Sequence, residues 1–215
     1  MKKLINYITL LGLTPVLMAS SNTSDEGNEP YTSSGMVTSH VVLDEASSII
    51  WEGSKIVGGK HVGTIAIEES SLTFNGTDLI GGSFVIDMTS IKNSDLDGGS
   101  AAKLEGHLKS EDFFGVSKYP NSTFHISDVK PGDEADEYHV TGDLTIKSTT
   151  LPITFPVVIS WDADRAIAKA KISVDRADFD VRFGSGRFFD GLGNKAIKDE
   201  FTLDITLVSE MSNKP

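Results

Sequence analysis

The 215-residue sequence contains no cysteine. Disulfide bonds, thiol catalysis and thiolate metal sites are therefore excluded, and so is the acylated cysteine that a bacterial lipoprotein needs. The sequence also lacks an apolar run of the roughly 20 residues that a membrane span requires. At this length the chain is expected to form one domain, and it is long enough to bury a substantial core without covalent cross-links.

Basic residues are scarce, because 19 lysines and arginines stand against 31 aspartates and glutamates. Lys2 and Lys3 open a segment that continues with a mostly apolar run, Leu4 to Met18, and then the small residues Ala19-Ser20-Ser21. This order predicts a secretory signal peptide over 1–21 and a periplasmic or secreted protein, with an uncleaved anchor as the alternative. Removing it leaves 17 bases and a net charge near −14. That charge argues against nucleic acid or an anionic membrane as a partner, and no stable membrane anchor is expected.

Three further segments follow the signal peptide. Residues 22–36 are polar and have little to bury, so they are predicted to form a disordered linker. The folded domain is expected over 37–209, and a loose tail over 210–215. No internal repeat of solenoid period is visible.

Within the folded part, apolar and polar residues alternate with a period of two. The clearest runs are 138–146, 151–161 and 201–207, and each predicts a strand with one apolar face. Pro152 and Pro156 lie on the less apolar face of the second run, which indicates an edge or unpaired outward N–H positions. Weaker strands are expected at 41–44, 49–57, 61–67, 71–75, 80–88, 122–128 and 166–174, with turns at Gly58-Gly59, Asn75-Gly76, Pro131-Gly132 and Asp162-Ala163-Asp164. About ten short strands favour an all-β antiparallel barrel or sandwich.

One stretch departs from this pattern and predicts a short helical insert near 100–114. Ser100 is a suitable N-cap, and Ala101, Leu104 and Leu108 fall at i, i+3 and i+7 to form an apolar stripe. So short a helix needs tertiary contacts to be stable. We expect it to dock at the mouth of the barrel and to close or gate that end, with Phe113 and Phe114 beside any bound chain.

The polar residues offer few arrangements for catalysis. None of the five histidines shows the spacing of a zinc helix, and no nucleophile elbow or phosphate-binding loop is present. An acid–base hydrolase or isomerase using His61 or His107 with Asp112 is one alternative; the simpler interpretation is that each histidine makes a local hydrogen bond at a rim. The cluster of Asp175, Arg176, Asp178 and Asp180 is interpreted as a solvated strand end with one arginine–aspartate pair rather than a carboxylate site. No catalytic residue, metal site or cofactor is predicted.

Aromatic residues are more informative, because many lie on apolar faces or beside the helix. They are Phe84, Phe113, Phe114, Phe124, Phe155, Phe179 and Phe201. Each one alone is explained by a filled core, whereas together they suit the lining of an elongated apolar pocket. A small barrel is either packed solid or holds one ligand, and both alternatives stay open. A cavity below about 300 Å³ would favour a solid barrel that acts as a surface interaction module.

Several motifs in a fixed order resemble one family. They are Ile50-Trp51-Glu52-Gly53, Gly59-Lys60-His61-Val62-Gly63, the HLKSEDFF run at 107–114, Lys118-Tyr119-Pro120, Phe124, the VTGDLTI run at 140–146, Leu151-Pro152-Ile153 and the VDRADF run at 174–179. Over roughly 40–208 the chain resembles the YceI-like family of polyisoprenoid-binding proteins. It departs at Lys147-Ser148-Thr149-Thr150, where the family commonly has a glycine-containing turn.

The resemblance implies a lipocalin-like antiparallel β-barrel whose elongated apolar cavity binds an isoprenoid or quinone-type lipid without catalysis. The family brings no catalytic residues, so none is carried over. A homodimer is left open. The candidate ligand-binding residues are Trp51, His61, Phe84, Leu104, His107, Leu108, Phe113, Phe114, Phe124 and Phe155.

Overall fold

The computed structural model describes residues 36–212. The expected signal peptide, all of the linker except Met36, and the last three residues lie outside this range. The strands are β1 (Val37–Val42), β2 (Ser48–Ser54), β3 (Lys60–Asn75), β4 (Asp78–Asn93), β5 (Asn121–Pro131), β6 (Glu137–Ile146), β7 (Thr149–Asp162), β8 (Arg165–Asp175) and β9 (Glu200–Met211). The helices are α1 (Gly98–Lys109) and the short turns η1 (Asp44–Ala46), η2 (Arg176–Phe179) and η3 (Gly193–Lys195).

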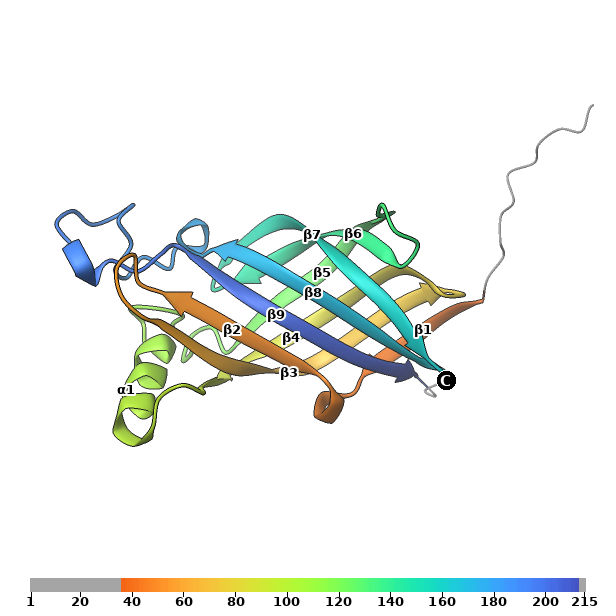
Figure 1. The fold of residues 1–215 in the computed structure, drawn as a ribbon, viewed down its shortest axis with the longest axis horizontal. Helices are drawn as coiled ribbons and strands as arrows, with labels where there is room; N and C mark the ends of the chain where they lie inside the picture. Colours follow the sequence, from red (N-terminus) through yellow and green to blue (C-terminus); the bar gives the residue numbers. More distant parts are fainter. Residues whose placement is uncertain (1–35, 213–215) are drawn as a thin grey trace, which may run out of the picture. The chain divides into compact units, whose positions relative to one another are not determined.

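The described strands form one antiparallel sheet that closes on itself, so the predicted all-β barrel with one short helix is confirmed (Figure 1). Neighbours follow the order β3-β2-β9-β8-β7-β6-β5-β4, and the pairing of β3 with β4 closes the ring. β1 shares the place of β2 between β3 and β9. β2 pairs with the first part of β3, and β1 pairs with its last four residues. The ring therefore has eight positions.

Two predicted strands, 61–67 and 71–75, are one strand. β3 runs through both, and its register against β4 shifts at Thr64/Ala66, Ile67/Glu69 and Thr73/Phe74. The bulges shift the register, so the strand continues through the polar residues between the two runs. They also bend the strand, as closure of a barrel requires. At the other end of the chain, β9 reaches Met211, two residues past the expected end of the domain.

The connections define two different ends of the barrel. At one end, tight turns over 76–77, 132–136 and 163–164 join the strands, as the turn signals predicted. At the other end lie the connections 55–59, 94–120, 147–148 and 176–199, which include α1, η2 and η3 (Figure 1). We call these the far end and the mouth end.

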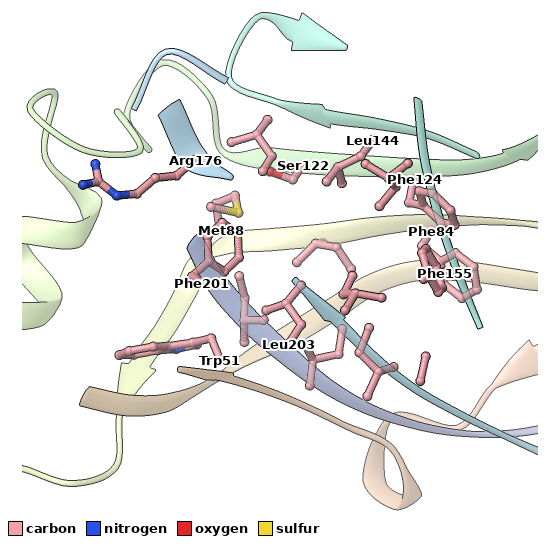
Figure 2. A pocket seen from close by; sticks show the side chains of 18 of the residues that line it. Trp51, Phe84, Met88, Ser122, Phe124, Leu144, Phe155, Arg176, Phe201 and Leu203 are labelled. Atoms are coloured by element: carbon pink, nitrogen blue, oxygen red, sulfur yellow. The ribbon is translucent and has the colours of Figure 1, made fainter. Parts of the chain in front are cut away.

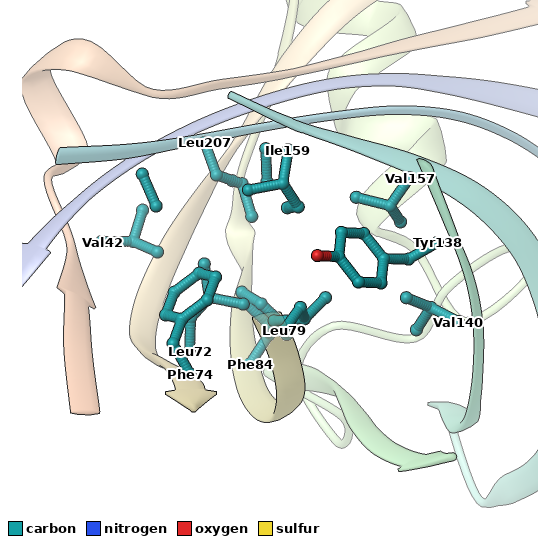
Figure 3. Packing of buried hydrophobic residues seen from close by; sticks show 12 residues of the cluster. Val42, Leu72, Phe74, Leu79, Phe84, Tyr138, Val140, Val157, Ile159 and Leu207 are labelled. Carbon is teal, nitrogen blue, oxygen red and sulfur yellow. The ribbon is translucent and has the colours of Figure 1, made fainter. Parts of the chain in front are cut away.

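The far end is filled by a packed apolar core. The fully buried rings of His40 and Phe74 meet edge to face with 4.9 Å between centroids, and Trp161 packs on both. Figure 3 shows Val42, Phe74 and Leu207 from separate strands facing the same interior space. The full cluster is Val42, Leu72, Phe74, Leu79, Phe84, Tyr138, Val140, Val157, Ile159, Ala166, Ala168 and Leu207.

The helical insert is shorter than predicted. α1 begins at Gly98 after Asp97 and ends at Lys109, so Ser100 lies inside it and Phe113 and Phe114 follow it in turns. Gly98 has a positive φ of 51°, which glycine tolerates at a helix start that lacks a side-chain cap. The stripe is half-buried at best, and tethering comes partly from Glu105, which accepts the backbone N–H of Asn93 at 2.8 Å.

Candidate ligand cavity

The barrel encloses a cavity of about 230 Å³. Strands β2 to β9 all contribute inward side chains to it, because the period of two places every second residue on the inner face. Figure 2 shows Met88, Leu144, Phe201 and Leu203 converging on it from opposite walls. Of the 34 lining residues, five carry a hydroxyl or a charge: Ser122, Lys169, Arg176, Lys198 and Glu200.

The cavity is elongated along the barrel. On β4 the lining runs from Leu79 near the far end to Ile91 near the mouth. Twelve residues of strand at about 3.3 Å each, tilted by about 40°, cover roughly 30 Å along the axis. A volume of about 230 Å³ spread over that length is narrow. Its shape suits a chain better than a compact molecule.

Three phenylalanines narrow the middle of this channel. The ring of Phe124 on β5 stacks on Phe84 of β4 at 6.4 Å and tilts against Phe155 of β7 at 5.5 Å (Figure 2). We call them the phenylalanine trio. Gly142 on β6 makes room for the central ring, because a Cβ there would lie 2.5 Å from Cζ of Phe124 and 2.5 Å from the carbonyl oxygen of His125. The glycine of the VTGDLTI run therefore shapes the cavity.

Trp51 forms part of the wall near the mouth. It lies on β2 opposite Gly63 of β3, and a Cβ at Gly63 would overlap its ring. The indole Nε1–H donates to the carbonyl of Thr64 at 3.2 Å. The ring is therefore held by this hydrogen bond and by its close contact with the backbone at Gly63. This arrangement turns an apolar ring toward the cavity entrance and satisfies its one polar atom.

Arg176 is the buried cation of the mouth, with 2% of its surface exposed. Its guanidinium donates to the carbonyls of Val181, Ile197 and Lys198 at 2.7, 3.3 and 3.1 Å, and Nη2 lies 3.3 Å from Asp199 Oδ1. That last contact is an ion pair without hydrogen-bond geometry. Burial lowers the pKa of Arg176, and the nearby Asp199 and Asp175 oppose the shift. The residue fastens the 176–199 connection over the barrel, while its stem lines the cavity.

The interpretation of the segment from Asp175 to Asp180 as a solvated strand end is wrong. The segment is held by ion pairs and contains the buried Arg176. Asp175 and Asp178 both pair with Arg187, at 2.5 and 2.6 Å. Two separate arginines therefore hold this connection, one from inside and one from outside.

The structure brings seven of the ten candidate ligand-binding residues to the cavity wall. They are Trp51, Phe84, Leu108, Phe113, Phe114, Phe124 and Phe155. The other three, His61, Leu104 and His107, lie outside the lining. Leu104 on α1 is half-buried but does not line the cavity.

His61 lies at the start of β3, where its Nδ1 is 2.9 Å from Asp95 Oδ2. Asp95 also accepts the backbone N–H of Val62 at 2.8 Å and the side-chain amide of Asn93 at 2.5 Å. The bond from Val62, together with those from His61 and Asn93, lowers the pKa of Asp95 to about 2, against the opposing effect of desolvation. These hydrogen bonds to Asp95 connect the start of β3, next to the β2–β3 turn, with the segment before α1.

His107 packs between Phe113 and Phe183, with ring centroids at 5.8 and 4.4 Å, and its Nε2 is buried without a partner. Asp112 is exposed. Among His61, His107 and Asp112 no hydrogen bond is formed, so the geometry gives the acid–base alternative no support.

Within residues 36–212, no group of three or more histidine, aspartate or glutamate side chains is placed to hold a metal ion. Over the same residues, none of the helices combines the length and apolarity that a bilayer crossing demands.

Sequence reasoning missed several lining residues, including Met88, Ile91 and Ile172. The alternation of Phe201, Leu203, Ile205 and Leu207 was a usable signal, since all four line the cavity.

A closed antiparallel barrel around an elongated apolar cavity, with a helix at one end, defines a lipocalin-like barrel. The family model of the YceI-like domain matches residues 41–209, and the chain belongs to that family. Protein YceI of Escherichia coli O157:H7 is 33% identical over 91 residues, which are 40% of this chain and 47% of that protein. Protein YceI of Salmonella arizonae is 33% identical over 86 residues, 37% of this chain and 44% of that protein. The chain thus spans about half the length of the curated relatives it matches.

Solved structures share the fold at low sequence identity. BcnA of Burkholderia cenocepacia superposes with a TM-score of 0.62 at 23% identity, covering 78% of this chain and 98% of that one. A polyisoprenoid binding domain of Saccharophagus degradans, implicated in plant cell wall breakdown, gives 0.59 at 15% identity, covering 81% and 99%. The YCEI protein of Campylobacter jejuni gives 0.52 at 18% identity, covering 69% and 84%.

Proposed function

We propose that this protein binds the apolar chain of an isoprenoid-type lipid inside its barrel and carries or sequesters it without catalysis. The observation that carries the proposal is the elongated cavity, whose 34 lining residues include only five with a hydroxyl or a charge. The description of the Saccharophagus degradans domain as polyisoprenoid-binding supports the same ligand class.

Burial of hydrocarbon supplies the binding free energy in this proposal. Each methylene transferred from water contributes about 0.8 kcal/mol. A chain that threads the channel needs no charge pairing, which agrees with the scarcity of polar groups along the wall. The polar head, a quinone ring for example, stays near the mouth, where Trp51, Arg176 and Glu200 lie.

The cavity volume sets the length of chain that the barrel accepts without rearrangement. About 230 Å³ is below the roughly 300 Å³ at which small-molecule sites usually begin. A long isoprenoid therefore fits only if the phenylalanine trio moves aside, since its rings narrow the channel. The same number favours a second candidate function, in which the barrel is essentially solid and acts as a surface interaction module.

Localisation belongs to the proposal as well. A basic start, an apolar run and small residues over 1–21 support export to the periplasm or beyond. There, an insoluble lipid needs a carrier or a store.

Ligand extraction distinguishes the two candidates. The protein is expressed in its native host with residues 1–21 present, purified, extracted with solvent and analysed by mass spectrometry, and the emptied protein is titrated with farnesol and longer isoprenoids. Binding predicts a recovered apolar lipid and saturable changes in tryptophan fluorescence. Protein that is repeatedly empty and indifferent to added isoprenoids would favour the solid-barrel module.

A blocking variant sharpens this test. Ala170 lines the cavity, so Ala170→Phe fills it and is expected to abolish isoprenoid binding while the barrel stays folded. Ala135→Phe makes the same change at an exposed turn of the far end and should bind normally. Equal binding by the two variants would contradict a cavity site.

A further inference from the structure

Large apolar side chains are exposed on the loops of the mouth end. Ile56 and Val57, in the β2–β3 turn, are 58% and 56% exposed. Phe183, Phe188 and Phe189, in the 176–199 connection, are 42%, 39% and 49% exposed. We call these five residues the rim patch. None of them lines the cavity, so packing of the interior does not explain them, and exposed aromatics in such a group mark an interaction surface.

The rim patch is built on one connected piece of structure. The N–H of Ile56 donates to the carbonyl of Ala196 at 2.9 Å, and the N–H of Ile197 donates to the carbonyl of Gly184 at 2.8 Å. Phe183, next in the chain to Gly184, packs on His107 of α1. The turn, the long connection and the helix therefore share one rim, and Ile197 and Lys198 from this rim also line the cavity.

Charge is distributed unequally between the two ends. The mouth-end connections 55–59, 94–120, 147–148 and 176–199 contain ten basic and nine acidic residues, although the whole chain carries a net charge of −12. The far-end turns 76–77, 132–136 and 163–164 contain four acidic residues and no basic one. An anionic surface therefore repels the far end more than the mouth, which orients the molecule with its mouth forward.

We propose that the rim patch docks this protein, reversibly and mouth first, on the surface of a lipid bilayer. The inference deepens the proposed function and rests on it, because a chain leaving the bilayer would then enter the cavity without crossing water. Phenylalanines inserted at the headgroup boundary supply the attraction. Arg182 lies 4.9 Å from the centroid of the Phe188 ring and is already paired with Asp180, so the apolar rings rather than a free cation carry the contact with the bilayer.

A bilayer is the occupant that these features favour. The five residues come from two separate loops of the mouth end, and none of them lines either of the two described pockets, so they form a projecting surface that suits a bilayer better than a peptide. The whole-chain charge argued against an anionic membrane, but that argument averages over an acidic far end and a nearly neutral mouth.

The test is vesicle sedimentation with the full protein, using vesicles of phosphatidylethanolamine and phosphatidylglycerol (3:1) that contain no isoprenoid. The unmodified chain is expected to sediment with the vesicles. Phe188→Ser/Phe189→Ser should weaken this by about tenfold or more. The matched control is Ile80→Ser/Val158→Ser, which removes two similarly exposed apolar residues (47% and 43%) from the barrel wall and should sediment like the unmodified protein.

Binding of farnesol in solution is measured on the same three proteins, so that the two proposals fail separately. Isoprenoid binding without vesicle binding overturns the docking inference and leaves the proposed function intact. Vesicle binding without isoprenoid binding overturns the proposed function and leaves the docking of the rim patch on a bilayer intact. Equal loss in both double variants overturns the rim patch. Dimerisation in analytical ultracentrifugation that Phe188→Ser/Phe189→Ser abolishes, with no vesicle binding, identifies a second copy as the occupant and also overturns it.

Discussion

Replacing Phe124 by alanine tests whether the phenylalanine trio limits the chain that the barrel accepts. Phe124 is half-buried and faces both the cavity and two other rings. Burying a phenylalanine fully is worth about 1.5–3 kcal/mol, and phenylalanine-to-alanine changes in filled cores cost about 3–5 kcal/mol because a new void remains. Since one side of this ring already borders empty space, we expect a loss of about 3 kcal/mol.

For a domain of this size that loss lowers Tm by roughly 6–12 °C. Phe74→Ala is the control, because Phe74 is fully buried in the far-end core and does not line the cavity. It should cost more in calorimetry. In lipid extraction, Phe124→Ala should retain longer isoprenoid chains than the unmodified protein, whereas Phe74→Ala should leave the chain lengths unchanged. Identical chain lengths from all three proteins would refute the view that the trio is the constriction.

Three further changes follow from other contacts. His40 is buried with both ring nitrogens unpartnered, and burial lowers its pKa below the usual 6.5 against an opposing effect of Asp164. The unfolded chain therefore binds the proton of His40 more readily than the folded protein does. The folded protein should reach its full stability above about pH 6.5 and become less stable as the pH falls below that value. The urea midpoints measured at pH 8, 6.5 and 5 should fall less in His40→Leu than in the unmodified protein. Arg176→Leu should cost about 3–5 kcal/mol by leaving three carbonyls and Asp199 without a partner; limited proteolysis should then cut within 176–199, and an uncut loop would contradict the clamp. Gly142→Ala should displace the ring of Phe124 and the carbonyl of His125, with a loss of about 1–3 kcal/mol and weaker isoprenoid binding; unchanged thermal unfolding would show that the wall yields freely.

The strands were predictable because their side chains alternate. Phe201, Leu203, Ile205 and Leu207 have an inward period of two that barrel closure does not alter, and all four line the cavity. Phe84, Phe124 and Phe155 line the cavity for the same reason. The continuity of β3 was not predictable, because its bulges put consecutive polar residues where alternation appears to stop.

The polar residues were harder to place from sequence, since their partners are distant in the chain. Arg176 stands among aspartates and looks solvated, but its acceptors at Ile197 and Lys198 are about twenty residues away. His61 was a candidate for ligand contact, and its actual partner Asp95 lies 34 residues on. The end of α1 was missed because Phe113 and Phe114 extend the apolar pattern beyond Lys109 without continuing the helix.

The prolines of β7 have a consequence for how the molecule behaves among its own copies. β8 pairs only with Val157–Asp162, so the first half of β7 has a partner on one side, β6. Pro152 and Pro156 remove the N–H donors at two positions along that incomplete seam. A strand from another chain that approached the seam would find gaps in the row of donors it needs. This half-paired part of β7 is thus a poor template for the addition of a strand from a second copy of the chain.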